Sequence, residues 1–168
     1  GESGKAYSFD GENDYIDLTK ANWGIEGNSA RTIFAWVKTT HEQKNGMAIF
    51  SSGTIANSQA FNIVSHRGVL GIMGYFNDFY PGVSNENTGI KYNDGVWHLV
   101  GVVHDGNKVE TYVDGNIDNV ATKTYNTKGQ NNYIGLSNHV NIGWSLFDGK
   151  LDDIRIYNRA LSETEVAA

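Results

Sequence analysis

The sequence predicts an all-β fold, a sandwich of two antiparallel sheets. Short stretches along the chain alternate between apolar and polar side chains, which is the period-two pattern of strands. Asp-Gly pairs separate many of these stretches and are common turn formers. They begin at Asp10, Asp94, Asp105, Asp114 and Asp148. Many short strands divided by such turns are typical of sandwiches and barrels.

The clearest element is a hairpin within residues 94–115, DGVWHLVGVVHDGNKVETYVDG. Trp97, Leu99 and Val103 should point to one face of its first strand, and Val100 and Val102 to the other. Both faces are largely apolar, so we expect this strand to lie in the middle of a sheet and to be covered on both sides. The turn DGN, followed by a return strand, completes the hairpin.

The other elements follow from the same pattern. Before the hairpin, we expect strands at 6–10, 15–18, 31–38, 47–53, 60–66 and 69–76. After it, we expect strands at 133–136 and 151–157, the latter with Leu151 and Asp153 on the same face. Ser162 and Glu165 fit a capping box, which predicts a short helical turn at 163–168. Trp36 and Trp97 are expected in the core, and Trp23 at its end.

Composition narrows the class of protein. The 168 residues are enough for one domain with an adequate core, and the absence of cysteine excludes disulfides and thiol chemistry. A net charge of −6 with scattered basic residues argues against nucleic-acid binding. No apolar run is long enough for membrane insertion, and no signal peptide begins the chain. We interpret residues 1–168 as a single domain excised from a larger bacterial protein that is secreted or displayed on the cell surface.

Three segments carry a family resemblance. The hairpin resembles the laminin-G and pentraxin group of concanavalin A-like sandwiches, and so do FDGENDYIDL at 9–18 and LDDIRIYNRALSETEV at 151–166. Together they bracket almost the whole chain. The resemblance implies a jelly-roll sandwich that is usually a non-catalytic module binding glycans or proteins.

Acidic residues indicate a calcium site. Asp10, Asn13 and Asp14 follow the first predicted strand and Asp152 lies at the start of the last one. First and last strands of a jelly roll often lie side by side, and Ca²⁺ prefers carboxylate, amide and carbonyl oxygens. The resemblance implies the same, because related glucanase sandwiches often hold a structural calcium through an Asp that Asp152 resembles. The alternative is that these residues only form turns.

Catalytic patterns are not evident. Glucanases with this fold resemble one another in an E-x-D-x-x-E or E-x-D-x-E run on one strand, and no such run occurs here. Glu110 and Asp114 are explained by the hairpin, and the five His residues show no metalloprotease or triad spacing. We therefore expect no enzyme activity.

Two aromatic and polar loops are candidates for a ligand site. Sugars present apolar C–H faces to aromatic rings and hydroxyls to polar side chains. The first loop offers Tyr75, Phe76, Asp78, Phe79 and Tyr80, and the second offers Asn138, His139 and Trp144. The alternative is that these rings fill the ends of the core.

The sequence as a whole predicts a carbohydrate-binding, lectin-like module, with a polysaccharide or glycan as its partner. A protein-binding adhesion module is the main alternative, because the fold does not decide between them. A glycoside hydrolase is the least favoured possibility.

Overall fold

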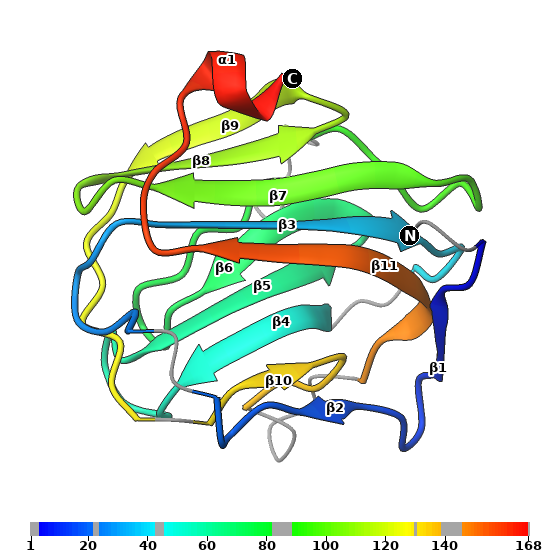
Figure 1. Cartoon of the computed structure of the whole chain (residues 1–168), viewed down its shortest axis with the longest axis horizontal. Helices are drawn as coiled ribbons and strands as arrows, with labels where there is room; N and C mark the ends of the chain where they lie inside the picture. Colours follow the sequence, from blue (N-terminus) through cyan, green and yellow to red (C-terminus); the bar gives the residue numbers. More distant parts are fainter. Residues whose placement is uncertain are drawn as a thin grey trace.

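The computed structural model describes residues 4–21, 24–42, 46–81, 89–129, 131–138 and 146–167, and it is a sandwich of two antiparallel sheets (Figure 1). One sheet has the order β1 (Tyr7–Asp10), β11 (Asp148–Tyr157), β3 (Arg31–Lys38), β7 (His98–His104), β8 (Lys108–Val113) and β9 (Asn116–Thr122). The other has the order β2 (Ile16–Asp17), β10 (Tyr133–Ile134), β4 (Met47–Gly53), β5 (Ala60–His66) and β6 (Val69–Met73). Within the described ranges, no helix has the length and apolar content needed to cross a membrane.

The core lies between the two sheets and is built from alternate residues of their strands. Val37, Val100 and Val102 come from the six-stranded sheet, and Phe61 and Leu70 come from the five-stranded sheet; all are almost completely buried. The predicted hairpin is confirmed as β7 and β8, with β7 paired to β3 on its other side. This central position explains why β7 is apolar on both faces.

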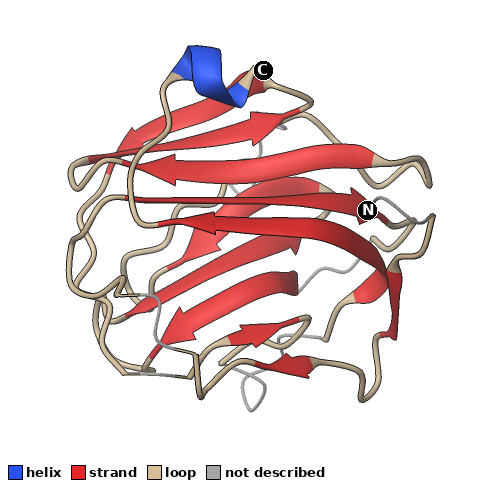
Figure 2. Ribbon diagram, viewed as in Figure 1, coloured by secondary structure: helices blue, strands red, loops and turns tan. Residues whose placement is uncertain are grey.

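The outer face of the six-stranded sheet is partly covered by the C-terminal helix. The helix α1 spans Glu163–Val166 and begins with the predicted capping box of Ser162 and Glu165. Val166 packs with Phe34 and Val103 on this outer face. Figure 2 shows α1 at the top of the view, near β8 and β9, and the helix covers only part of this face.

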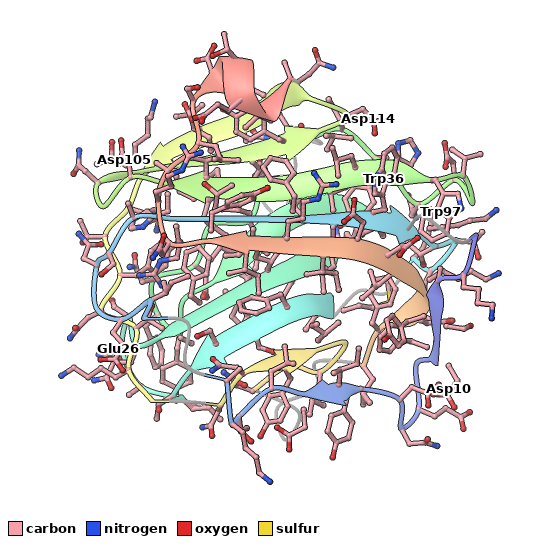
Figure 3. The ribbon with its side chains drawn as sticks, in the orientation of Figure 1. Asp10, Glu26, Trp36, Trp97, Asp105 and Asp114 are labelled. Carbon is pink, nitrogen blue, oxygen red and sulfur yellow. The ribbon has the colours of Figure 1, made fainter. Side chains whose placement is uncertain are left out.

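Trp36 and Trp97 are not core residues, so that prediction is wrong. Each remains 37% exposed, on or beside the outer face of the six-stranded sheet. Figure 3 shows the two side chains at the same end of the sheet, near Asp114. The alternation along β3 was predicted correctly, since Ile33 and Val37 point into the core. The error came from assuming that the opposite face would also be covered.

A β-bulge changes the facing of side chains in β11. Asp152 pairs with Trp36, whereas Arg155 pairs with Phe34, so β11 has one extra residue between them. Leu151 is consequently in the core while Asp153, at a positive φ of 45°, is partly exposed. The expectation that Leu151 and Asp153 share a face is therefore wrong.

Several boundaries also differ from the sequence prediction: β2 and β10 are two residues long, and β11 begins at Asp148 rather than Leu151. The strand expected at 69–76 ends at Met73, and residues 74–76 form a loop. Strand β9 was not predicted, because its residues are mostly exposed or half-buried and lack a clear alternation. As an edge strand, β9 needs only one apolar face against its neighbour.

Candidate functional site

The loop after β6 holds two adjacent aromatic residues, Tyr75 and Phe76, in an unusual backbone conformation. Tyr75 and Phe76 have φ angles of 55° and 58°, in the left-handed region that bulky residues rarely adopt. Their rings meet edge to face with centroids 4.7 Å apart, and Phe76 is 82% exposed. Such strain persists where the surrounding structure holds it, and it is frequent at binding sites.

Several hydrogen bonds hold this loop in place. The backbone N–H of Gly74 donates to Asp78 Oδ1 at 2.8 Å, and Asn77 Nδ2 donates to the Thr124 carbonyl at 2.6 Å. Lys123 Nζ donates to the Asp78 carbonyl at 2.8 Å and to Asn77 Oδ1 at 3.3 Å. The loop is thus tied to the segment that follows β9.

A neighbouring loop adds a second strained residue. Ser58, between β4 and β5, has a φ of 59°, and its N–H donates to the Tyr75 carbonyl at 3.1 Å. Ile55 in the same loop is 45% exposed. The β4–β5 loop therefore supports Tyr75 from the other side.

Phe79 and Tyr80 are placed differently from Tyr75 and Phe76. Phe79 pairs through its backbone with Ile72 and packs against the main core. Tyr80 packs against a small cluster that includes Val64. Burial, followed by the nearby charge of Asp78, raises the pKa of Tyr80 well above its usual value. These two rings anchor the loop, while Phe76 is presented to solvent and Tyr75 is half-buried beside it.

The second predicted loop is described only at its start. Asn138 is half-buried, and its Nδ2 donates to the Gly53 carbonyl at 2.9 Å, beside the β4–β5 loop. His139 and Trp144 lie outside the described residues, as does Trp23.

The predicted calcium ligands fall into two places. Asp10 Oδ1 accepts from the N–H groups of Glu12 and Asn13 at 2.8 and 3.1 Å, and Asp14 Oδ2 accepts from the Asp10 N–H at 3.1 Å. These hydrogen bonds lower the pKa of Asp10. The turn is at the lower right of Figure 3, where Asp10 is labelled.

Asp152 is separate from this turn. β1 and β11 are neighbours as predicted, but Asp10 is opposite Asp148. Asp152 is four residues further along β11, which is about 13 Å at the rise of a strand. Within the described ranges, no group of three or more acidic or histidine side chains could hold a metal ion. The four predicted residues therefore do not form one ligand set.

The residues that brace the aromatic loop could not have been found from local patterns. Lys123 and Thr124 are more than forty residues after Asn77 in the chain, and the hairpin of β8 and β9 brings them to the loop. A sequence gives no sign of a hydrogen bond across such a separation. The aromatic composition of 74–80 was the detectable signal.

Comparison with known proteins identifies relatives of this fold. The family model described as the Concanavalin A-like lectin/glucanases superfamily matches residues 10–167. No curated protein matches the chain.

Solved structures share the architecture at low sequence identity. Domain 4 of AbnA, a GH43 extracellular arabinanase from Geobacillus stearothermophilus in complex with arabinotriose, has a TM-score of 0.74 and 22% identity, covering 99% of this chain and 77% of that one. The CBM40 of the Ruminococcus gnavus IT-sialidase, bound to alpha2,3 sialyllactose, has a TM-score of 0.71 and 16% identity, with 97% and 95% coverage. The SAP-like pentraxin from Limulus polyphemus has a TM-score of 0.60 and 19% identity, with 84% and 70% coverage. At these identities the likeness shows the fold alone.

Proposed function

The chain belongs to the Concanavalin A-like lectin/glucanases superfamily, and from that premise we propose that it is a non-catalytic module that binds carbohydrate. Two structures with the same fold contain oligosaccharides, arabinotriose in one and sialyllactose in the other. We further propose that the module works outside the cell as part of a larger protein. The extracellular arabinanase, in which the similar unit is one domain, supports this proposal.

The observation that carries the proposed function is the braced aromatic pair. Phe76 is 82% exposed and its ring is held edge to face against Tyr75, so the loop offers a fixed apolar surface to a ligand. The flat ring of Phe76 suits the C–H face of a sugar, and the adjacent side chains of Asn77 and Asp78 offer polar groups for hydroxyls. Because the loop is already held in its conformation, binding would require little ordering.

Replacement of Phe76 tests this assignment. Phe76→Ala should weaken saccharide binding by about 1–3 kcal/mol, the range seen for aromatic anchors at interfaces, which is roughly 5- to 150-fold in Kd. The melting temperature should hardly change, because the ring is mostly exposed. Isothermal titration with arabinotriose, 3′-sialyllactose and neutral trisaccharides of glucose, galactose and mannose measures the effect.

Tyr7→Ala is the matched control. Tyr7 is another exposed aromatic residue, 64% exposed, but it is on β1 in the other sheet. Its replacement should leave binding unchanged. Equal affinity in Phe76→Ala and the unaltered protein would show that the loop is not the site. Absence of binding to every saccharide by the folded protein would favour a protein-binding adhesion module.

Two carboxyl groups, Glu165 and Asp105, have surroundings unlike those of a catalytic acid. A glycosidase needs one carboxylic acid with a raised pKa to protonate the leaving group. The pKa of Glu165 is instead lowered to about 2 by the hydrogen bonds from Arg159 and then from Ser162. Hydrogen bonds from Asp105's neighbours Lys108 and Asn107 likewise lower the pKa of Asp105.

The expected result is that the module hydrolyses no polysaccharide. Incubation with β-glucans, galactans and alginate should release no reducing sugar above the level of a heat-denatured sample. Activity that disappears in Glu110→Gln, in which the best-buried carboxylate is neutralised, would refute this expectation.

A further inference from the structure

A cleft lies on the outer face of the six-stranded sheet, away from the 74–80 loop. It has a volume of about 250 Å³ and is lined by Trp36 of β3, Leu99 of β7, Arg155 and Tyr157 of β11, and Glu165 of α1. The wall formed by α1 and the preceding segment makes this a hollow on an otherwise open sheet face. The volume is below the range of about 300–1,000 Å³ for drug-sized ligands, so it suits a small ligand or one unit of a chain.

The floor of the cleft depends on the absence of a side chain at Gly101. Gly101 is opposite Phe34 across β3 and β7, and a Cβ at this position would overlap the Phe34 ring. The ring can therefore lie over Gly101, where it approaches Tyr112 with a centroid distance of 5.9 Å. The result is an apolar floor beside the half-exposed indole of Trp36.

The bulge in β11 places two charged groups on the wall of the cleft. Asp153, at its positive φ, accepts from Arg155 through two bonds, Nε to Oδ1 at 3.1 Å and Nη2 to Oδ2 at 2.6 Å. Bulges and strained residues are frequent where a strand redirects side chains into a site. Two of the five guanidinium N–H groups of Arg155 are used in this pair, and Tyr157 is a further hydrogen-bond partner of the guanidinium, so the remaining N–H groups can reach a ligand beside both side chains.

The charges of the cleft select for a neutral polar ligand. Asp153 is balanced by Arg155, and Glu165 is balanced by Arg159 through bonds of 2.7 and 2.9 Å. An anionic ligand would bring its charge next to one of the two carboxylates. A hydroxyl, which both donates and accepts, can bind at such a pair without displacing either partner.

We propose that this cleft binds one unit of a neutral saccharide, as a second carbohydrate site distinct from the 74–80 loop. The inference rests on the proposed carbohydrate-binding function and extends it to a two-site module. A sugar ring would stack on Trp36 with its hydroxyls directed to Asp153, Arg155 and Tyr157. One polysaccharide could then bind with an internal unit in the cleft and with its end at the 74–80 loop. Binding at two linked sites raises the overall affinity without additional contacts.

Nuclear magnetic resonance of the ¹⁵N-labelled chain tests the proposal. The indole N–H signal of Trp36, identified with Trp36→Phe, should shift on titration with at least one neutral trisaccharide of arabinose, glucose, galactose or mannose. The concentration of 3′-sialyllactose needed for the same shift should be at least tenfold higher, because this ligand carries a carboxylate. In Trp36→Ala, the shifts of the backbone amides of Leu99 and Arg155, which also line the cleft, should require a roughly tenfold or more higher saccharide concentration, while amide shifts in residues 74–78 persist.

Trp97→Ala is the matched control, because Trp97 has the same exposure as Trp36 but does not line the cleft. It should leave both responses unchanged. Asp153→Asn provides a second test that keeps the aromatic surface, and it should weaken the cleft response alone. Phe76→Ala should abolish the loop response and leave the cleft response intact.

The outcomes separate the two proposals. A loop response with no change at Trp36 for any neutral trisaccharide would overturn the second site and leave the proposed function standing. No response at either place would overturn both. Concentration-dependent dimerisation in sedimentation equilibrium that Trp36→Ala removes would show that a second copy of the chain occupies the cleft instead.

Discussion

Both ring nitrogens of His98 face carboxylate oxygens. Nδ1 is 2.7 Å from Asp114 Oδ2, and Nε2 is 3.1 Å from Asp94 Oδ1. A neutral imidazole has a single N–H, so only the protonated ring can donate to both. Burial alone would lower the pKa of His98, but the hydrogen bonds to Asp114 and then Asp94 outweigh it, so the pKa is raised. His98 thereby links the loop before β7 to the end of β8.

Stability should therefore depend on the protonation of His98. The pKa of histidine in the unfolded chain is about 6.5. Because the pKa of His98 is higher than this in the folded protein, its contribution to the free energy of unfolding is fully present below about pH 6.5 and is lost as the pH rises through the folded-state pKa. Urea unfolding of the unaltered protein and of His98→Gln should show a stability difference that shrinks from about pH 6 to pH 9.

His104 also makes the free energy of unfolding depend on pH, with the opposite sign to His98. It is present both in the unaltered protein and in His98→Gln. Burial lowers its pKa, so its cost appears as pH falls below the unfolded value and cancels in the difference between the two proteins. Asp94→Asn is a milder control that keeps the bond between His98 and Asp114. A stability difference that does not change with pH would contradict the role assigned to His98.

The burial of single aromatic side chains was only partly predictable from the sequence. The composition of residues 74–80 made Tyr75 and Phe76 candidates for a ligand site, which stays a prediction; both are in a strained loop, where Phe76 is exposed and Tyr75 is half-buried. The same reasoning assigned Trp36 and Trp97 to the core. Alternation gives the face on which a side chain lies, but whether that face is covered depends on where another element, here α1, happens to pack.

Single strands were predictable where their alternation was regular. In β3 and β7 the alternation identified the residues that point into the core, such as Val37 and Val100. In β11 the extra residue at the bulge breaks the period, so Leu151 and Ile156 both reach the core although their positions differ by an odd number. Nothing in the letters LDDIRIY marks the bulge, because Asp is common in regular turns as well as at positive φ.

The C-terminal helix is a single turn whose stability depends on its cap. The N–H of Glu165 donates to Ser162 Oγ at 3.3 Å, and the Ser162 N–H donates to Glu165 Oε2 at 2.9 Å. Ser162→Ala should destabilise the protein by about 1 kcal/mol, the usual cost of losing an N-cap. Thr164→Ala, two residues further along, should cost less, because the Thr164 hydroxyl bonds to the Ser162 hydroxyl at 3.1 Å rather than to a backbone N–H of the helix. Denaturant midpoints of the two variants compare them, and equal losses would contradict the capping role.

The assembly of the two sheets determines which distant residues can share a ligand. That β1 and β11 are neighbours was predictable from the fold, and it holds. The register between them was not, and it places Asp10 opposite Asp148. Register depends on the whole set of cross-strand contacts, so a short strand such as β1 can pair with different partners of similar apolar pattern.

This register decides how calcium should act on stability. Ca²⁺ ligands lie 2.3–2.6 Å from the ion, so Asp10 and Asp152, about 13 Å apart along the sheet, cannot hold the same ion. We expect any calcium-dependent rise in the melting temperature to come from the turn of Asp10, Asn13 and Asp14. Free calcium at a concentration of about 100 times its Kd would raise the free energy of unfolding by about 2.7 kcal/mol.

Melting in excess calcium and in EDTA, for three proteins, tests this expectation. The difference between the two conditions should vanish in Asp10→Ala and persist in Asp152→Ala, because Asp152 is bonded within the bulge to the N–H of Asp153 rather than to the turn. Asp17→Ala, which replaces another exposed carboxylate at the end of β2, is the control for loss of negative charge. A calcium response that Asp152→Ala abolishes as completely as Asp10→Ala would show that the two carboxylates act on one ion after all, and that the register of β1 on β11 differs in solution.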